Sequence, residues 1–257
     1  MESSPFGARA PVEFWQAELG GEESTRSAAT RLAEGSVSRV RGLHIECRAP
    51  DAALGDLYRV ESRRAQVIAE VIAVDRDAAV LMPYGDASGV SAGSAVERAI
   101  DLEPVRVSSA VLGRVVDCLG KSLDGGAAVF EGESVRLDGD ALSPMLRGIH
   151  ERRMTLGVRE IDTFLPAYRG ERIGIFSRAG GGENALLGEI AKGARADVVV
   201  VGLVGGSART AEHFVRTHLR ETLARSVVVV ASRDRAPVER VRAQKNSAIA
   251  VEAFAAR

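Results

Sequence analysis

The chain shows two hydrophobic patterns in succession. In residues 36–99 apolar and polar residues alternate in short runs, as expected for strands with one buried face. Turn residues such as Pro50, Gly55 and Gly93 separate the runs. Several short strands at this spacing indicate a small β-barrel or sandwich. The expected strands are residues 37–47, 56–60, 65–74 and 79–82.

Beyond a helix-like stretch at residues 157–165, the pattern becomes alternating β and α. Three apolar runs predict strands at 173–176, 197–204 and 226–231, and helical patterns lie at 183–194, 208–224 and 237–256. The runs are unbroken, as in parallel strands that are buried on both faces. We therefore expect a doubly wound α/β unit, with ligands at the carboxyl ends of its strands. Three strands are few for such a sheet and leave an apolar edge without a partner.

These patterns divide the chain into four parts. Residues 1–35 form a polar arm, 36–100 a β-barrel domain, 101–150 a connection and 151–257 a partial α/β domain. Within the arm, residues 12–19 could form a short helix that carries Trp15, the sole tryptophan. This segment is either a weakly ordered arm or a helix that docks on a partner protein.

Composition excludes several functional classes. The net charge of −1 gives no field that would favour nucleic acid or an anionic membrane. Cys47 and Cys118 fit a reducing compartment and lack metal-ligand spacing. The N-terminus lacks the pattern of a signal peptide, and the longest apolar run is too short to span a bilayer. We expect a cytoplasmic protein.

Residues 169–192 carry the strongest chemical signal. A short strand enters a glycine-rich turn from which a helix leaves, the layout of a phosphate-binding P-loop. The working motif is G-x-x-x-x-G-K-[ST], in which the lysine contacts the phosphates and the hydroxyl holds magnesium. Glu183 stands at the lysine position, Asn184 at the hydroxyl position and Ser177 at the first glycine. The candidate site, a degenerate P-loop, is Gly180, Gly181, Gly182, Glu183, Asn184 and Ala185.

Replacing the lysine by glutamate removes an attraction for the phosphates and adds a repulsion. The loop is therefore either a weak nucleotide site or a strand-to-helix turn with no ligand. A second sequence, Gly120-Lys121-Ser122, lacks the earlier spaced glycine and the strand-to-helix context, so we interpret it as a turn between short strands. His44 shares its spacing with no second ligand and is interpreted as a barrel side chain.

Several stretches together resemble the flagellar and type III secretion export ATPases, relatives of the catalytic subunit of rotary ATP synthases. The resemblance covers residues 36–254 and no single stretch carries it. The stretches are Leu81-Met82-Pro83, 89–93, 112–117, 120–125, Gly157-Val158-Arg159, 169–176, 195–205 and 224–231. It implies an N-terminal β-barrel followed by a RecA-like P-loop α/β nucleotide domain, with ATP and Mg²⁺ as the family's cofactors. It also implies partners, namely other export-ATPase subunits and a stator-like regulator, with at most peripheral contact to the export gate and a possible oligomer.

The departures from the family fall on its chemistry. Members carry the lysine and hydroxyl where this chain has Glu183 and Asn184, and a Glu-Arg pair where it has Gly206-Ser207. That glutamate polarises the attacking water, and its loss typically costs about 10²–10⁴ in rate. The magnesium-associated aspartate, the trans-acting arginine and the C-terminal helical domain would lie beyond Arg257, and Asp234 is interpreted as a turn carboxylate.

Three hypotheses follow. The first is a truncated, catalytically inactive homologue of the export ATPase, acting at most as an assembly or regulatory component. The second is an ATP-binding or ATP-hydrolysing member that borrows a cation, Arg178 or Lys192. The third is a pure protein-interaction module. Whether the export is flagellar or virulence-associated stays open, and so does a decaying gene product.

Overall fold

The computed structural model describes residues 35–99, 105–126, 133–135, 152–178 and 180–255. The expected helix at 12–19 lies outside these residues. None of the described helices is both long and apolar enough to cross a bilayer.

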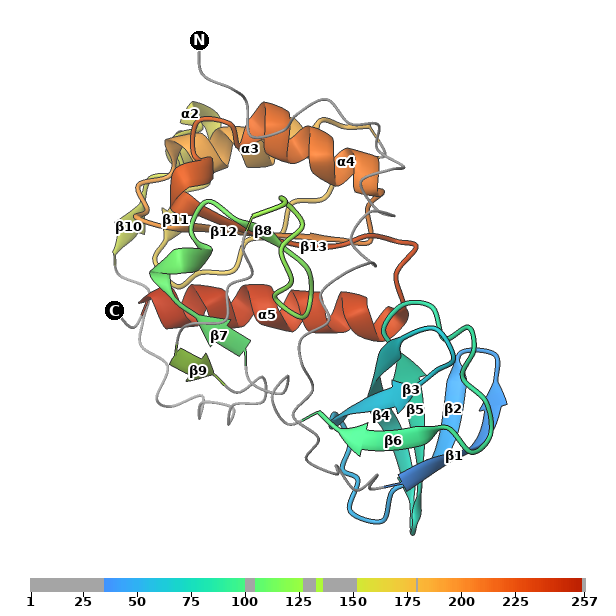
Figure 1. The fold of residues 1–257 in the computed structure, drawn as a ribbon. Helices are drawn as coiled ribbons and strands as arrows, with labels where there is room; N and C mark the ends of the chain where they lie inside the picture. The colour runs from blue at the N-terminus through green and yellow to red at the C-terminus, as the bar shows by residue number, and fades with distance from the viewer. Residues whose placement is uncertain (1–34, 100–104, 127–132, 136–151, 179, 256–257) are drawn as a thin grey trace. The chain divides into compact units, whose positions relative to one another are not determined.

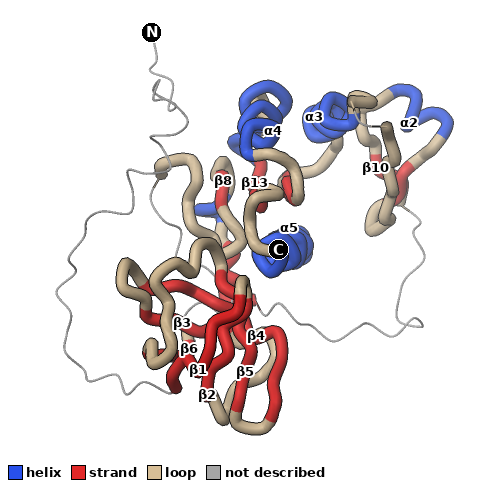
Figure 2. The backbone as a smooth tube through the Cα atoms, turned by 90° about the vertical axis from the view of Figure 1, so that its right-hand side faces the viewer, coloured by secondary structure: helices blue, strands red, loops and turns tan. Residues whose placement is uncertain are grey.

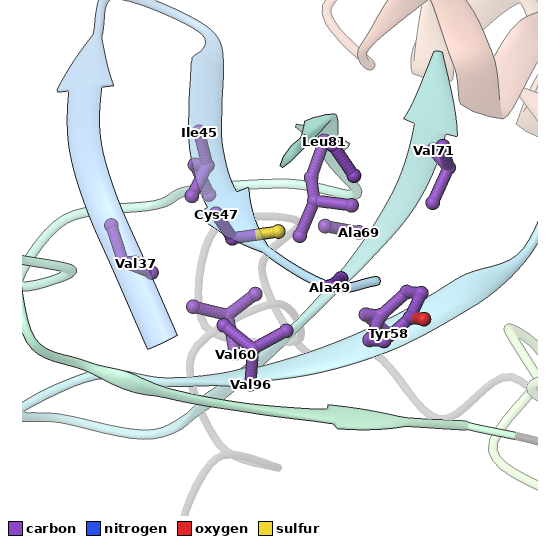
Figure 3. Close-up of a cluster of buried hydrophobic side chains, with 11 residues drawn as sticks. Val37, Ile45, Cys47, Ala49, Tyr58, Val60, Ala69, Val71, Leu81 and Val96 are labelled. Carbon is purple, nitrogen blue, oxygen red and sulfur yellow. The ribbon is translucent and has the colours of Figure 1, made fainter. Parts of the chain in front are cut away.

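Six short antiparallel strands close into a barrel in the order β1-β2-β5-β4-β3-β6 (Figure 1). Because alternate side chains of a strand point to opposite faces, each strand sends every second residue inward. The inward residues form a tight apolar core, with Ile45, Leu81 and Val60 fully buried (Figure 3). The strands are β1 (Gly35–Arg41), β2 (His44–Arg48), β3 (Leu57–Glu61), β4 (Gln66–Asp75), β5 (Ala78–Pro83) and β6 (Ala95–Arg98).

The first expected strand was wrong in its extent, since residues 37–47 form the β1–β2 hairpin. Val37, Ile45 and Cys47 all point into the core. All three residue numbers are odd, so the alternation of buried and exposed positions continues through the turn. The hydrophobic pattern therefore does not reveal the turn. Only Gly42, beside exposed Leu43, marks the reversal. His44 is the exposed first residue of β2, as expected for a barrel side chain.

The α/β region contains a three-stranded parallel sheet in the order β12-β13-β8. Its strands are β12 (Val199–Val204), β13 (Ser226–Ala231) and β8 (Val115–Val116). α5 (Pro237–Ala255) covers one face of the sheet, and α3 (Glu183–Gly193) and α4 (Ala208–His213) lie on the other (Figures 1 and 2). Apolar clusters fill both spaces. One includes Val229 and Ala243, and the other includes Val228 and Phe214.

Two expectations for this region were wrong. The first is the strand at 173–176, because those residues are exposed and pair with none of the described strands. The third strand of the sheet is instead the two-residue β8, from the predicted connection. The second is the single helix at 208–224: α4 ends at His213, a π-helical turn follows (Phe214–His218), and a 3₁₀ turn (Leu223–Arg225) comes before β13.

The remaining elements are short. α2 (Arg159–Phe164) lies within the expected helix-like stretch, and a 3₁₀ turn spans Ser109–Val111. Two small antiparallel pairs complete the described structure: β7 (Val105–Val107) with β9 (Glu133–Val135), and β10 (Arg153–Met154) with β11 (Ala167–Tyr168). Both cysteines are buried free thiols, and burial raises the pKa of Cys47 to about 11.

Candidate functional site

The glycine loop keeps the backbone shape of an anion-binding turn. Gly180 and Gly182 have φ values of 76° and 85°, a left-handed conformation that glycine adopts without strain. Gly182 is the N-cap of α3, and the Gly181 N–H donates to the Arg178 carbonyl at 2.8 Å. The helix therefore starts where the sequence predicted, with its free N–H groups beside the loop.

Glu183, the first residue of α3, provides this loop with its own anion. The Ser177 hydroxyl donates to Glu183 Oε2 at 2.9 Å. The backbone N–H of Glu183 itself and the Ser177 hydroxyl lower the pKa of this carboxyl, so it is ionised at neutral pH. A negative charge at a helix N-terminus is favourable, and the carboxylate engages one of the N–H groups that a bound phosphate would also use.

The other candidate residues add no positive charge. Asn184 and Ala185 lie in the first turn of α3, Asn184 half-buried and Ala185 exposed. The segment that enters the loop is also unlike a P-loop strand. Ile173 is 52% exposed and Phe176 97% exposed, so these apolar side chains contact little of the described structure.

Gly206, the position where the resemblance places a catalytic glutamate, lies just after the carboxyl end of β12. Its carbonyl accepts a hydrogen bond from the Arg233 N–H at 2.8 Å. The next residue, Ser207, is the N-cap of α4, and its hydroxyl accepts from the Thr210 N–H at 3.1 Å. Both residues serve the turn and its helix, and neither has a carboxylate.

Comparison with known proteins now identifies the family. The model of the ATP synthase alpha/beta family's beta-barrel domain matches residues 37–99, and the model of its nucleotide-binding domain matches residues 157–257. The chain belongs to the ATP synthase alpha/beta family. The resemblance and the fold class derived from the sequence, a β-barrel followed by a partial nucleotide-binding α/β domain, are thereby confirmed.

The relatives include export ATPases. The chain is 36% identical over 228 residues to the type 3 secretion system ATPase of Sinorhizobium fredii, covering 88% of this chain and 51% of that one. It is 36% identical over 224 residues to the flagellum-specific ATP synthase of Bacillus subtilis, covering 86% and 51%. This family member thus spans about half the length of the curated relatives it matches.

A solved structure supports the same assignment. The assembled ATPase EscN in complex with its central stalk EscO, from the type III secretion system of enteropathogenic E. coli, superposes with a TM-score of 0.79. The sequence identity is 34%, and the match covers 86% of this chain and 54% of EscN.

Arg178 and Lys192, the two candidate substitutes for the missing P-loop lysine, differ in their distance from the glycine loop. Arg178 lies in the loop and is exposed. Lys192 lies in the last turn of α3, about 13 Å along the helix axis from Glu183. Its ammonium group contacts Glu189 at 3.4 Å. Lys192 therefore cannot replace the missing lysine, and Arg178 is the candidate that remains.

Asp234 and the Gly120-Lys121-Ser122 turn play no part in the glycine loop. Asp234 follows β13 on an exposed turn, and the hydroxyl of Ser232 contributes most to lowering its pKa. Gly120-Lys121-Ser122 forms a turn, as predicted. Asp117 holds that turn by accepting the N–H groups of Leu119 and Lys121 at 2.8 and 2.9 Å.

Sequence reasoning missed one well-built polar group, which is structural. Arg114 donates from Nε and Nη2 to both carboxylate oxygens of Asp124, each at 2.9 Å, beside β8. Asp124 also accepts the Val115 N–H and the Ser122 hydroxyl. The spacing of ten residues between partners on a turn gives no helical or strand signal by which to find the pair.

The residues present do not fit a nucleoside triphosphate with magnesium. An ionised carboxylate lies where the phosphates need a cation, and Gly206 leaves attacking water without a carboxylate partner. Among the described residues no group of three or more His, Cys, Asp or Glu could hold a metal ion.

Proposed function

We propose that this chain is a catalytically inactive homologue of the ATPase that energises flagellar and type III protein export, acting at most as an assembly or regulatory component. One observation carries the proposal: the Glu183 carboxylate, held by Ser177, stands at the position of the P-loop lysine. Gly206 at the glutamate position supports it independently. On this proposal the chain binds ATP and Mg²⁺ weakly or not at all.

Electrostatics explain why the loop rejects ATP although its backbone is intact. Four phosphate charges would meet a carboxylate whose lowered pKa keeps it ionised. Protonating Glu183 would remove the repulsion, yet it would not supply the charge that stabilises the transferring phosphoryl group. Glu183 therefore opposes both binding and hydrolysis, and Gly206 adds a second, independent defect in hydrolysis.

An assembly role is favoured by the barrel, whose core is complete. The solved relative EscN is an assembled ATPase in complex with a stalk protein. The proposed partners of this chain are accordingly export-ATPase subunits and a stator-like regulator. A pull-down with the full chain and with residues 36–100 tests this role, and failure of both to retain any export component would refute it.

The direct test of inactivity is magnesium-dependent ATP turnover by the purified chain. We expect no turnover above the rate without protein. Turnover that disappears on Gly181→Pro would contradict the proposal, because it would come from the glycine loop. Circular dichroism of Gly181→Pro beside the wild type is the control for nonspecific loss of structure.

The competing function is ATP binding with Arg178 as a substitute cation, favoured by the position of Arg178 in the loop, where its carbonyl accepts the Gly181 N–H. It predicts ATP binding that Arg178→Ala abolishes. Binding that survives this substitution would exclude the arginine as the source of the charge.

A further inference from the structure

A π-helical turn follows α4 on the way to β13. It spans Phe214–His218, directly after the last residue of α4, and the Leu219 N–H donates to the Phe214 carbonyl at 3.2 Å, five residues back. Such turns are rare and frequently occur at functional sites. The extra residue in the turn changes which side chains share a face of the helix.

His213 and His218, at the two ends of this turn, lie side by side. In a continuous α-helix, residues five apart would point in directions about 140° apart, because each residue turns the helix by about 100°. Here the two ring centroids are 5.9 Å apart, and the ring planes are nearly perpendicular, at 89°. The π-helical turn thus pairs two imidazoles that an α-helix would separate.

The separation of the two rings fits two ligands of one metal ion. Two imidazoles on a tetrahedral zinc ion, with Zn–N distances of about 2.0–2.1 Å, have centroids roughly 5–6 Å apart. Imidazole nitrogen also suits copper and nickel ions. His213 is exposed, and rotation about its outer side-chain torsion, which has a broad energy minimum, can direct Nε2 toward the space between the rings.

Neighbouring side chains orient both rings. Thr217 Oγ1 lies 3.3 Å from Nδ1 of His213. An outer hydrogen bond of this kind fixes the tautomer of a metal-binding histidine and leaves its Nε2 for the ion. His218 is half-buried, because its ring lies 5.4 Å from the ring of buried Phe214 and its side chain packs against Gly188 of α3. One ligand is therefore held by packing, while the other can adjust to the ion.

We propose that His213 and His218 bind one divalent transition-metal ion of the class of Zn²⁺, Cu²⁺ and Ni²⁺, with water completing its coordination. The site has two protein ligands, so it is consistent with the absence of larger metal-binding groups among the described residues. Arg216 pairs with Glu212 at 3.0 Å, which reduces its repulsion of a bound cation. The ion would cross-link the end of α4 to the turn that packs on α3.

The test is a calorimetric titration of the full chain, without a histidine tag, with Zn²⁺ alone. We expect saturable binding of one ion per chain that EDTA reverses. Because an ion that binds only the folded chain stabilises it, the melting temperature should rise. Amide hydrogen exchange should slow at least about threefold in residues 208–219, since the ion would restrain local opening there.

Substitution of each histidine identifies the ligands. His213→Ala removes an exposed ligand and should weaken Zn²⁺ binding at least about tenfold. His218→Gln removes the other ligand, keeps a side chain of similar size against Gly188, and should have the same effect. The matched control is His44→Ala, at an exposed histidine of the barrel, which should leave the affinity unchanged. His150→Ala, outside the described residues, is the second control.

Three results would overturn the proposal. One is the lack of any saturable binding of Zn²⁺. Another is binding that both His213→Ala and His218→Gln leave unchanged, which would assign the ion to other residues. The third is one ion for every two chains, which would assign the ion to a contact between two copies.

Discussion

At the scale of single residues, ionised carboxylates perform opposite tasks in this chain. Glu183 is half-buried at the start of α3, and its charge sets what the glycine loop can bind. Asp124 is largely buried and fastens a turn to β8. Burial alone would raise the pKa of Asp124, but hydrogen bonds from Arg114, Ser122 and two backbone N–H groups outweigh it and hold that pKa well below its usual range.

Asp124→Asn should lower the free energy of unfolding by about 2 kcal/mol at pH 7, because it removes charged hydrogen bonds to a largely buried arginine. The folded pKa lies below the unfolded value of 3.8, so the contribution is present above pH 4 and is lost as the pH falls below 3.8. Urea unfolding of wild type and variant at pH 7, 5 and 3 measures it. The control is Asp77→Asn, at an exposed turn position. An unchanged difference between pH 5 and pH 3 would contradict the linkage.

At the scale of elements, the sequence predicts those whose pattern is local and long. The valine run of β13 gives a strand at residues 226–231, and the glycines before Glu183 give the start of α3. β8 has two residues and is defined by its pairing with β13, so no window of sequence could reveal it. The opposite error occurs at residues 173–176. Their apolar run predicts a strand, but such a run forms a strand only where neighbouring strands pair with it.

The candidate site was predictable in identity but not in geometry. The absence of lysine at residue 183 and of glutamate at residue 206 can be read directly from the sequence. The hydrogen bond from Ser177 to Glu183 depends on how the loop folds back on the helix, which spacing alone does not determine. α3 is continuous from Glu183 to Gly193, as the helical pattern predicted, and this places Lys192 far from the loop.

α3 packs closely against the π-helical turn at Gly188. A Cβ at this position would lie 2.6 Å from the Cβ of His218. Alanine favours a helix by up to about 1 kcal/mol over glycine, but overpacking typically costs about 1–3 kcal/mol. We therefore expect Gly188→Ala to destabilise the chain in thermal unfolding. Ala185→Gly, at an exposed position of the same helix, is the control for propensity alone. A rise in the melting temperature of Gly188→Ala would show that the contact is loose.

At the scale of the whole molecule, the barrel and the α/β region differ in how completely their sheets are paired. Each barrel strand has two neighbours, so the barrel has no open edge. Among the described residues the parallel sheet has three strands, and β12 pairs on one side only. Local stability depends on how completely a sheet is paired, because amide hydrogens at an open edge exchange with solvent through small local fluctuations.

We accordingly expect amide exchange in residues 36–98 to be at least about tenfold slower than in residues 155–255. Native-state hydrogen exchange with peptide resolution measures this difference. Within the α/β region, β13 should be better protected than β12, since in the part of the chain that the structure describes β13 has strand neighbours on both sides and β12 on one. Uniform protection across the two regions would contradict the argument from sheet completeness.

The central claim is that the framework of the ATP synthase family persists here while its nucleotide chemistry is lost at the loop. Titration calorimetry with Mg·ATP, on the wild type and on the double variant Glu183→Lys/Asn184→Ser, tests it most directly. We predict no heat of binding from the wild type at high micromolar concentration and measurable binding by the double variant. Binding by the wild type, or silence from both proteins, would contradict the claim.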